Sequence, residues 1–309
     1  MKPYVILADL TCDLSEEIRK DFGVTDYVKG HISIDGRDME SRLDWDLISK
    51  NEFYRLLGDK KVKITTAPPN PEEYCEIFTK YVTDGYAVLS MSISSKISGT
   101  YDFSCVAAER VREAHPEAEI YCFDSYRMSG AFGLLVAHAH KMKNEGKTLE
   151  QVIAWLEENK FRVHQMGPID DLMFVARRGR ITMGKAIMGS FAGVKPMGDC
   201  NADGYTTVLT KAKGIKKALD ITVQYVKQTA EKIEDQFLII SHSDRDLYAR
   251  TLKEMVEEEL KPKKVYVCDV FAGSGSNIGP GMIGIYYLGA PISQDLSAEK
   301  EAINRILGK

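Results

Sequence analysis

The sequence of 309 residues has no long apolar run and no closely paired cysteines. Its longest apolar runs are interrupted by charge well before the length that a bilayer-spanning helix needs. The first residues, MKPYVILADLT, read directly as a strand and not as a signal peptide. Six cysteines are scattered without a C-x-x-C pair, which is typical of reduced thiols inside the cell. We therefore expect a cytoplasmic protein with no stable membrane insertion.

An excess of positive charge is also missing. The chain has 41 Lys and Arg against 45 Asp and Glu, so the formal net charge is -4, and neither sign forms a long block. Proteins that bind nucleic acid or anionic membranes need a basic surface. This balance predicts no nucleic-acid partner, and it favours a small molecule or another protein.

Three motifs that carry catalysis or cofactor binding are absent. The glycine-rich stretch FAGSGSNIGPGMIG has Ile278 where the dinucleotide fingerprint needs a third glycine, and it has no Walker lysine. The chain lacks the G-x-S-x-G nucleophile elbow. His138 and His140 stand two residues apart in a helical run, which places them on different faces. We expect no cofactor and no metal.

The first half of the chain alternates short β-rich runs with helical patterns. Strands are expected at residues 4–9, 62–67, 86–92 and 119–125, each followed by a helix. This alternation predicts a parallel sheet with crossover helices. The Asp35-Gly36 pair between the first two strands predicts a hairpin or flap.

The second half of the chain has a different order of expected elements. A helix is expected at residues 149–159, followed by a β run, a glycine-punctuated segment, a hairpin that turns at Asn201 and Asp203-Gly204, and two further αβ units. We therefore expect two α/β domains, residues 1–148 and 149–309.

Hydroxyl side chains are frequent in the loops that follow the expected strands. Thr66 and Ser98 each stand just before a helix, and Ser98 belongs to the run SISSKISGT. Loops at the carboxyl ends of parallel strands meet at one edge of the sheet, and a helix N-terminus attracts anions. Helix capping is the simpler interpretation for any single hydroxyl. Their number in one loop favours a site for a carboxylate or phosphate.

A second interpretation stays open on the same residues. Ser98 could act as a nucleophile with His242, which follows an expected strand in SHSD, as its base. The chain would then be a Ser-dependent acyl hydrolase, although the elbow motif is missing. The plainer reading of His242 and Asp244 is a polar pair at a strand end.

Several segments together resemble motifs of the DegV family. ISSKISGTY resembles S-S-x-L-S-G-T-Y, and TTAPPNPEEY resembles T-S-Q-P-S-P-E-E-F. DDLMFVARRGRIT is similar to D-D-L-x-Y-L-x-x-G-G-R-I-S, and GSGSNIGPGMIGI to G-T-H-x-G-P-G-x-L-G. GVKPMGDCNADG and KAKGIKKAL resemble two further family segments. These matches follow the family order along most of the chain.

The resemblance implies a fold and a function. The expected fold has an N-terminal three-layer α/β/α domain with a parallel sheet and a C-terminal two-layer α/β domain with a mixed sheet. A long-chain fatty acid is expected in a tunnel between the domains. Members of the family serve as the acyl-carrying subunit of a bacterial fatty-acid kinase, so the resemblance implies a non-catalytic chain that presents the carboxylate to a separate ATP-binding subunit.

The resemblance also assigns residues. It implies that Thr66 and Ser98 donate to the carboxylate and that Arg180 lies near the mouth, facing the partner and the phosphate. The residues expected at the carboxylate are Thr66, Ser98, Gly99, Ser276 and Asn277. Apolar side chains expected along the tunnel, where methionine suits a flexible ligand, are Met183, Ile187, Met188, Phe191 and Phe271. Ordinary core packing stays an alternative for each of them.

The chain departs from the family pattern near the expected head-group site. Asn277 stands where the family has histidine, and Ser276 where it has threonine. Ala67 replaces a serine and Arg178 a glycine. Asparagine donates hydrogen bonds but cannot carry a charge. A different lipid or a small acid therefore stays open as the ligand.

Overall fold

The computed structural model describes residues 2–181 and 193–309. Four of the expected tunnel residues, Met183, Ile187, Met188 and Phe191, lie outside the described residues. Within the described part, no helix combines the length and the apolarity that crossing a bilayer requires.

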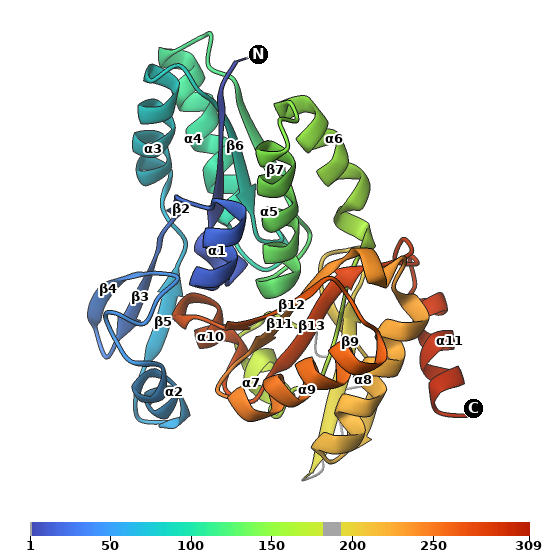
Figure 1. The fold of residues 1–309 in the computed structure, drawn as a ribbon. Helices are drawn as coiled ribbons and strands as arrows, with labels where there is room; N and C mark the ends of the chain where they lie inside the picture. Colours follow the sequence, from blue (N-terminus) through green and yellow to red (C-terminus); the bar gives the residue numbers. More distant parts are fainter. Residues whose placement is uncertain (1, 182–192) are drawn as a thin grey trace.

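The N-terminal half is built on a four-stranded parallel sheet, sheet A, with the order β2-β1-β6-β7. Its strands are β1 (Tyr4–Asp9), β2 (Tyr27–Val28), β6 (Ala87–Ser92) and β7 (Ile120–Asp124). Helices cover both faces, so sheet A is the middle of three layers (Figure 1). One face carries α3 (Pro71–Thr83) and α4 (Thr100–Ala114), and the other carries α1 (Glu16–Phe22), α5 (Ser129–Asn144) and α6 (Leu149–Asn159).

The pattern of β1 shows why this sheet is buried on both sides. Tyr4, Ile6 and Ala8 belong to the core beneath α5, whereas Leu7 belongs to the core beneath α3 and α4. Successive residues of a strand point to opposite faces, so an unbroken apolar strand suits a sheet covered on both sides. The expected parallel sheet is confirmed.

The expected strand at residues 62–67 has a different place. It forms β5 (Ile64–Ala67), which joins β3 (Gly30–Ile34) and β4 (Arg37–Ser41) in a separate antiparallel sheet B of order β4-β3-β5. The predicted hairpin at Asp35-Gly36 connects β3 and β4, and both turn residues have positive φ angles. The hairpin provides the antiparallel edge that β5 pairs with, so β5 does not enter sheet A.

The C-terminal half is built on a mixed sheet, sheet C, with the order β12-β11-β13-β8. Its strands are β8 (Val163–Met166), β11 (Phe237–His242), β12 (Lys264–Asp269) and β13 (Ile283–Leu288). β11 and β12 are parallel, and the other pairs are antiparallel. The outer face packs against α8 (Ile215–Thr229), α9 (Asp246–Glu259) and α11 (Ser297–Ile306). The expected hairpin is present as β9 (Val194–Cys200) and β10 (Thr206–Lys213).

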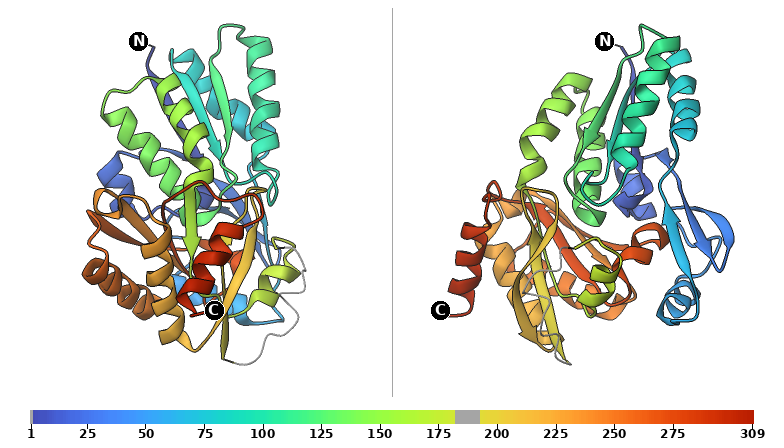
Figure 2. Two further views of the ribbon diagram at one scale, coloured as in Figure 1. Left: turned by 90° about the vertical axis from the view of Figure 1, so that its right-hand side faces the viewer. Right: turned by 180° about the vertical axis from the view of Figure 1, so that it is seen from behind.

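Helix α5 lies between the two sheets (Figure 2). Apolar residues of α5 share one core with β1 and with Phe237, Ile239 and Tyr286 of sheet C. α5 is packed between both halves, and a helix that is buried in this way is expected to be apolar on all its faces. α6, which follows the expected domain boundary at residue 148, packs on the same core, and the chain then enters sheet C at β8.

The remaining elements connect these layers. They are α2 (Lys50–Gly58), α7 (Leu172–Arg177), α10 (Ala272–Ile278) and the short 3-10 helices η1 (Leu10–Cys12), η2 (Lys160–Arg162) and η3 (Ile233–Asp235). Ala272 of α10 packs in a core with Ile32 and Ile64 of sheet B and Phe53 of α2. Sheet B therefore joins the N-terminal half to the C-terminal half.

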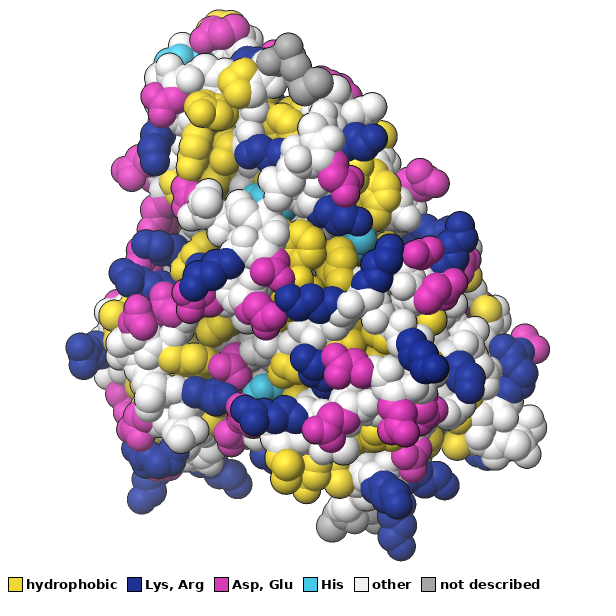
Figure 3. Space-filling model, viewed as in Figure 1, with side chains coloured by type: hydrophobic (Ala, Val, Ile, Leu, Met, Phe, Trp, Pro, Cys, Tyr) yellow, Lys and Arg dark blue, Asp and Glu magenta, His cyan; other side chains and the backbone are white. Residues whose placement is uncertain are grey.

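The front face of the molecule mixes charges of both signs, without a large block of one sign (Figure 3).

Candidate functional site

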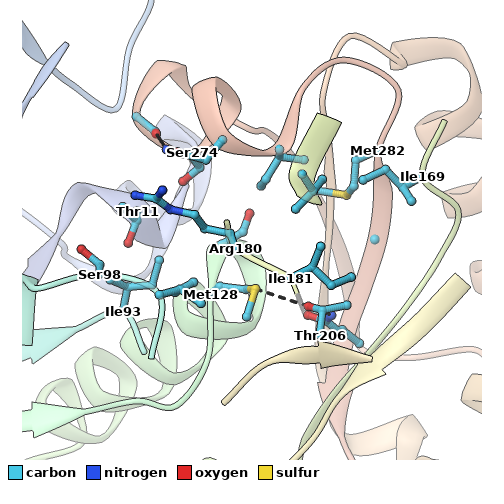
Figure 4. Close-up of a pocket in the computed structure, with 18 of the residues that line it drawn as sticks. Thr11, Ile93, Ser98, Met128, Ile169, Arg180, Ile181, Thr206, Ser274 and Met282 are labelled. Atoms are coloured by element: carbon cyan, nitrogen blue, oxygen red, sulfur yellow. Dashed lines mark hydrogen bonds between the residues drawn. The ribbon is translucent and has the colours of Figure 1, made fainter. Parts of the chain in front are cut away.

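A cavity of about 210 Å³ lies where sheet A, sheet B and the C-terminal half meet. Its lining includes the loops after β1 and β6, the end of β5, and residues of β8, β9, α7, α10 and β13. Most lining side chains are apolar, and several hydroxyls gather on one side (Figure 4). An enclosed apolar wall with a few polar groups is typical of a small-molecule site.

Thr66 and Ser98 both line this cavity. Thr66 is the next-to-last residue of β5, and two prolines follow the strand. Asn277 Nδ2 donates to Thr66 Oγ1 over 3.1 Å and to the Gly273 carbonyl over 3.3 Å. Because Thr66 Oγ1 accepts from Asn277, its own hydroxyl hydrogen remains available for another acceptor.

Ser98 stands at the start of α4. Its Oγ lies 2.7 Å from Thr100 Oγ1 and accepts weakly from the Thr100 N–H over 3.4 Å. The N-cap residue of α4 is Gly99 and no side-chain capping bond is present, so Ser98 stands beside the helix N-terminus without capping it, and it lines the cavity. Either hydroxyl can donate in the pair of Ser98 and Thr100; when Thr100 donates, the hydrogen of Ser98 remains available for a ligand.

Two buried carboxylates hold the loops that carry these hydroxyls. Asp9 accepts from the N–H groups of Thr11 and Ile93, each over 2.8 Å. Asp124 accepts from the N–H groups of Ser95 and Tyr126, each over 3.1 Å. Burial raises the pKa of Asp9. The loops after β1, β6 and β7 are thus fixed by side chains at the ends of the same sheet.

Asp13 joins the two halves directly below the cavity. Its carboxylate accepts from Ser129 Oγ of α5 over 2.6 Å and from the Phe271 N–H before α10 over 3.1 Å. Burial raises the pKa of Asp13 to about 7. Ser129 lines the cavity, so one wall of the site is fixed by a contact between the N-terminal and C-terminal halves.

Sequence reasoning missed Ser129 and two further serines at this site. Ser41, at the end of β4, and Ser274, in α10, line the cavity, and their buried Oγ atoms have no hydrogen-bond partner among the described residues. A Cβ at Gly273 would collide with Leu10 and approach Ser41 Oγ to 3.2 Å. Glycine and serine alternate around position 274, and glycines allow another segment of the chain to approach the backbone closely. This pattern was a signal in the sequence that could have pointed to Ser274. Ser41 had no local signal, because only the fold brings β4 to α10.

Arg180 also lines the cavity, as the resemblance leads one to expect of a residue near its mouth. Figure 4 shows its guanidinium on the side where Thr11 and Ser274 lie. One of its nitrogens donates to the Arg178 carbonyl. Arg178, which replaces a family glycine, donates from Nη1 to the Ile64 carbonyl over 2.9 Å. This substitution therefore ties the end of α7 to β5.

Three other expected site residues lie differently. Gly99 is the N-cap residue before α4 and is not among the lining residues. Ser276 is buried and donates from its hydroxyl to the Ala272 carbonyl over 2.7 Å, so it points into its own helix. Phe271 packs in the core, with its ring centroid 5.4 Å from that of Trp45. The structure thus brings together Thr66, Ser98, Asn277 and Arg180, but not these three.

A second polar cluster lies outside the cavity. His242, Asp246 and Asp269 form the one group of three potential metal ligands found in the part of the chain that the structure describes. Lys50 Nζ already bridges the two carboxylates, at 2.6 Å from Asp246 and 3.0 Å from Asp269. An ammonium in this place supplies the positive charge that a metal would bring. His242 contacts these carboxylates and accepts from the Arg245 N–H, and no described contact pairs it with Ser98.

The fold and the cavity define a class of two-part α/β protein with a largely apolar internal site that is polar at one side. A family model described as "Uncharacterised protein, DegV family" matches residues 3–290. A DegV domain-containing protein of Clostridium perfringens is 32% identical over 289 residues, which cover 94% of this chain and 98% of that protein. The chain belongs to the DegV family.

Solved structures share this fold. One, described as fatty acid binding of a DegV family protein from Thermus thermophilus, matches with a TM-score of 0.82 and 24% identity, over 94% of this chain and 100% of that one. The Streptococcus pneumoniae Fatty Acid Kinase (Fak) B3 protein loaded with linoleic acid matches with a TM-score of 0.79 and 16% identity, over 93% and 99%. The expected α/β architecture with one parallel and one mixed sheet is confirmed.

Proposed function

We propose that this protein binds a long-chain fatty acid in the cavity, with the carboxylate at Thr66 and Ser98. The observation that carries the proposal is the division of the cavity into an apolar wall and one side that gathers hydroxyls. Burying a tail of about sixteen carbons contributes roughly 0.8 kcal/mol per methylene, which is on the order of ten kcal/mol before ordering costs. The tail would thus supply the affinity.

The polar side would orient the acid. Thr66 has a hydroxyl hydrogen to give because Asn277 occupies its oxygen. Ser41 adds a buried hydroxyl without a described partner, and Ser274 adds one that lies beside the Asp13 carboxylate.

These hydroxyls are neutral donors, which hold a carboxylate less tightly than a charged clamp does, so the acid stays available for transfer. The guanidinium on this side is that of Arg180, which also donates to the Arg178 carbonyl. In this arrangement Asn277 orients Thr66 without carrying charge, in the place of the family histidine.

We further propose that the chain presents the carboxylate to a separate ATP-dependent fatty-acid kinase subunit and has no turnover of its own. The support is the family membership, the likeness to the Streptococcus pneumoniae Fak B3 protein, and the lack of a Walker or dinucleotide motif in the sequence. Arg180, at the cavity and only partly engaged by the Arg178 carbonyl, would face the partner and the phosphate.

Native mass spectrometry tests the binding step. Protein purified from a bacterial host should carry a mass increment that matches a fatty acid, lose it on delipidation and regain it when hexadecanoic acid is added. A chain that stays empty after re-feeding would remove the proposal. Transfer of phosphate from ATP to the bound acid, on addition of a fatty-acid kinase subunit and not without it, would test the presentation step.

Two alternatives have their own tests. An acyl hydrolase would need a base beside Ser98, and the described partner of its Oγ is Thr100. A Ser98→Ala protein that still cleaves acyl esters would exclude that role. Asn277 also suggests a ligand other than a fatty acid. If that is so, Asn277→His should change which acid copurifies with the protein, and unchanged selectivity would count against this alternative.

A further inference from the structure

A polar pair interrupts the apolar wall of the cavity away from Ser98. Gln165 on β8 and Thr206 on β10 both line the cavity, and Gln165 Nε2 donates to Thr206 Oγ1 over 2.8 Å. Thr206 Oγ1 in turn donates to Met128 Sδ over 3.4 Å. Figure 4 shows Met128 and Ile93 between Ser98 and Thr206. The pair therefore faces the space that an acyl tail would occupy.

The surroundings of this pair are apolar. Met166 on β8, Met197 on β9 and Val208 on β10 line the cavity from the same strands as the pair or the strand between them, and Figure 4 shows Ile169, Ile181 and Met282 on the side of Thr206. A saturated tail would displace water from the pair and offer no hydrogen bond in return, which is unfavourable for an amide. A site built for a plain hydrocarbon tail would be expected to have an apolar side chain at position 165.

The pair is held in place from behind. The Gln165 N–H donates to Asp199 Oδ1 over 2.8 Å, and Asp199 Oδ2 is bound by His164 Nδ1 over 2.7 Å and by the Tyr225 hydroxyl over 2.9 Å. Asp199 and His164 are buried. Thr206 is fixed in the β9–β10 hairpin. The buried network therefore fixes the backbone at Gln165, and the bond to Thr206 holds the Gln165 amide towards the cavity.

The hydrogen bonds among the described residues leave part of the Gln165 amide free. They engage Nε2 with Thr206 and leave Oε1 without a donor. We infer that the cavity takes a long-chain acid with a hydroxyl group along its tail, and that Gln165 recognises this hydroxyl. The inference rests on the proposed function and assigns a chemical class to its ligand. A hydroxyl both donates and accepts, so it can pair with either end of the amide.

Competition binding to the delipidated full chain tests this. The probes are octadecanoic acid and hydroxyoctadecanoic acids with the hydroxyl near the middle or towards the end of the tail. We expect the wild type to bind at least one hydroxy acid about tenfold more tightly than the plain acid, the effect of one added hydrogen bond. Gln165→Leu should remove or reverse this preference while binding the plain acid at least as well.

Two further variants make the result specific. Thr206→Val keeps the side-chain shape, removes the hydroxyl that holds Gln165, and should also reduce the preference. Gln224→Leu, on α8 and outside the cavity lining, should leave it unchanged. A wild type that binds the plain acid but shows no preference for any hydroxy acid would overturn the inference alone. A protein that binds none of the acids would overturn the proposed function as well.

Discussion

At the scale of single residues, the proposed carboxylate site uses two hydroxyls whose oxygens already have described partners. Asn277 donates to Thr66 Oγ1, and Ser98 Oγ pairs with Thr100 Oγ1. These contacts fix both oxygens before a ligand arrives, which reduces the ordering cost of binding. An asparagine in place of the family histidine is sufficient for such orientation.

The first prediction concerns these two hydroxyls. Thr66→Val and Ser98→Ala should each weaken binding of hexadecanoic acid by about tenfold or more, because hydrogen bonds to a charged group contribute roughly 1.5–3 kcal/mol. Isothermal titration of delipidated protein measures the effect. Thr83→Val, which removes an exposed hydroxyl of α3, is the matched control. Equal affinities in all four proteins would contradict the assignment of the carboxylate site.

At the scale of secondary-structure elements, close packing of α5 against sheet C holds the two halves together. A Cβ at Gly130 of α5 would collide with the Tyr286 ring and lie 2.6 Å from Ser241 Oγ. Gly130→Ala should therefore lower the free energy of unfolding by about 1–3 kcal/mol, as overpacking does. Urea denaturation measures it.

A glycine in open space provides the control for this substitution. Gly58 ends α2, and nothing lies within 4 Å of a Cβ built there. Gly58→Ala should be neutral or stabilising by up to about 1 kcal/mol. If the two substitutions had the same effect, the close approach of α5 to sheet C would not limit stability.

The buried pair of His164 and Asp199 predicts a pH dependence. Burial lowers the pKa of His164, but the Asp199 carboxylate and the Ala290 carbonyl, which both accept from its ring, outweigh burial and raise the pKa above 6.5. A pKa that is higher in the folded state stabilises the fold fully below 6.5, and this contribution is lost as the pH rises through the raised value.

Urea denaturation at several pH values tests this contribution. From pH 6.5 upwards the free energy of unfolding should fall by up to about 1.4 kcal/mol per pH unit within the titration range. The double variant His164→Gln with Asp199→Asn should lack this part of the slope, because it has no group to titrate there. An identical slope in both proteins would show that His164 is not charged in the folded state.

The elements also show what the sequence could and could not predict. Three strands of sheet A, β1, β6 and β7, were predictable because their apolar runs and the helices between them are local patterns. The two-residue strand β2 was not predicted. The place of β5 in a separate sheet was not predictable, because its partner β3 lies some thirty residues earlier in the chain, beyond a hairpin. The argument from loops after parallel strands holds for Ser98, whereas Thr66 lies within β5 of the antiparallel sheet B and reaches the cavity from there. Ser41 and Gln165 were missed because only tertiary packing brings them to the cavity, whereas Ser274 had a signal in its glycine-serine run.

At the scale of the whole molecule, the cavity is shared by both halves, and the ligand should join them. Residues of sheet A, sheet B and sheet C contact the same space. Binding of the acid to the folded chain alone stabilises it by about 2.7 kcal/mol at a hundred times the Kd. The melting temperature of delipidated protein should therefore rise with added hexadecanoic acid. Hexadecanol, which has the tail without the carboxylate, should raise it less.

The most direct test of the account is an experimental structure of the protein re-fed with hexadecanoic acid. The account predicts continuous density for an acyl chain in the cavity, with a carboxylate oxygen within hydrogen-bond distance of Thr66 Oγ1 and another within reach of Ser98 Oγ. An acid bound elsewhere, or bound in the cavity with its carboxylate away from both hydroxyls, would contradict it.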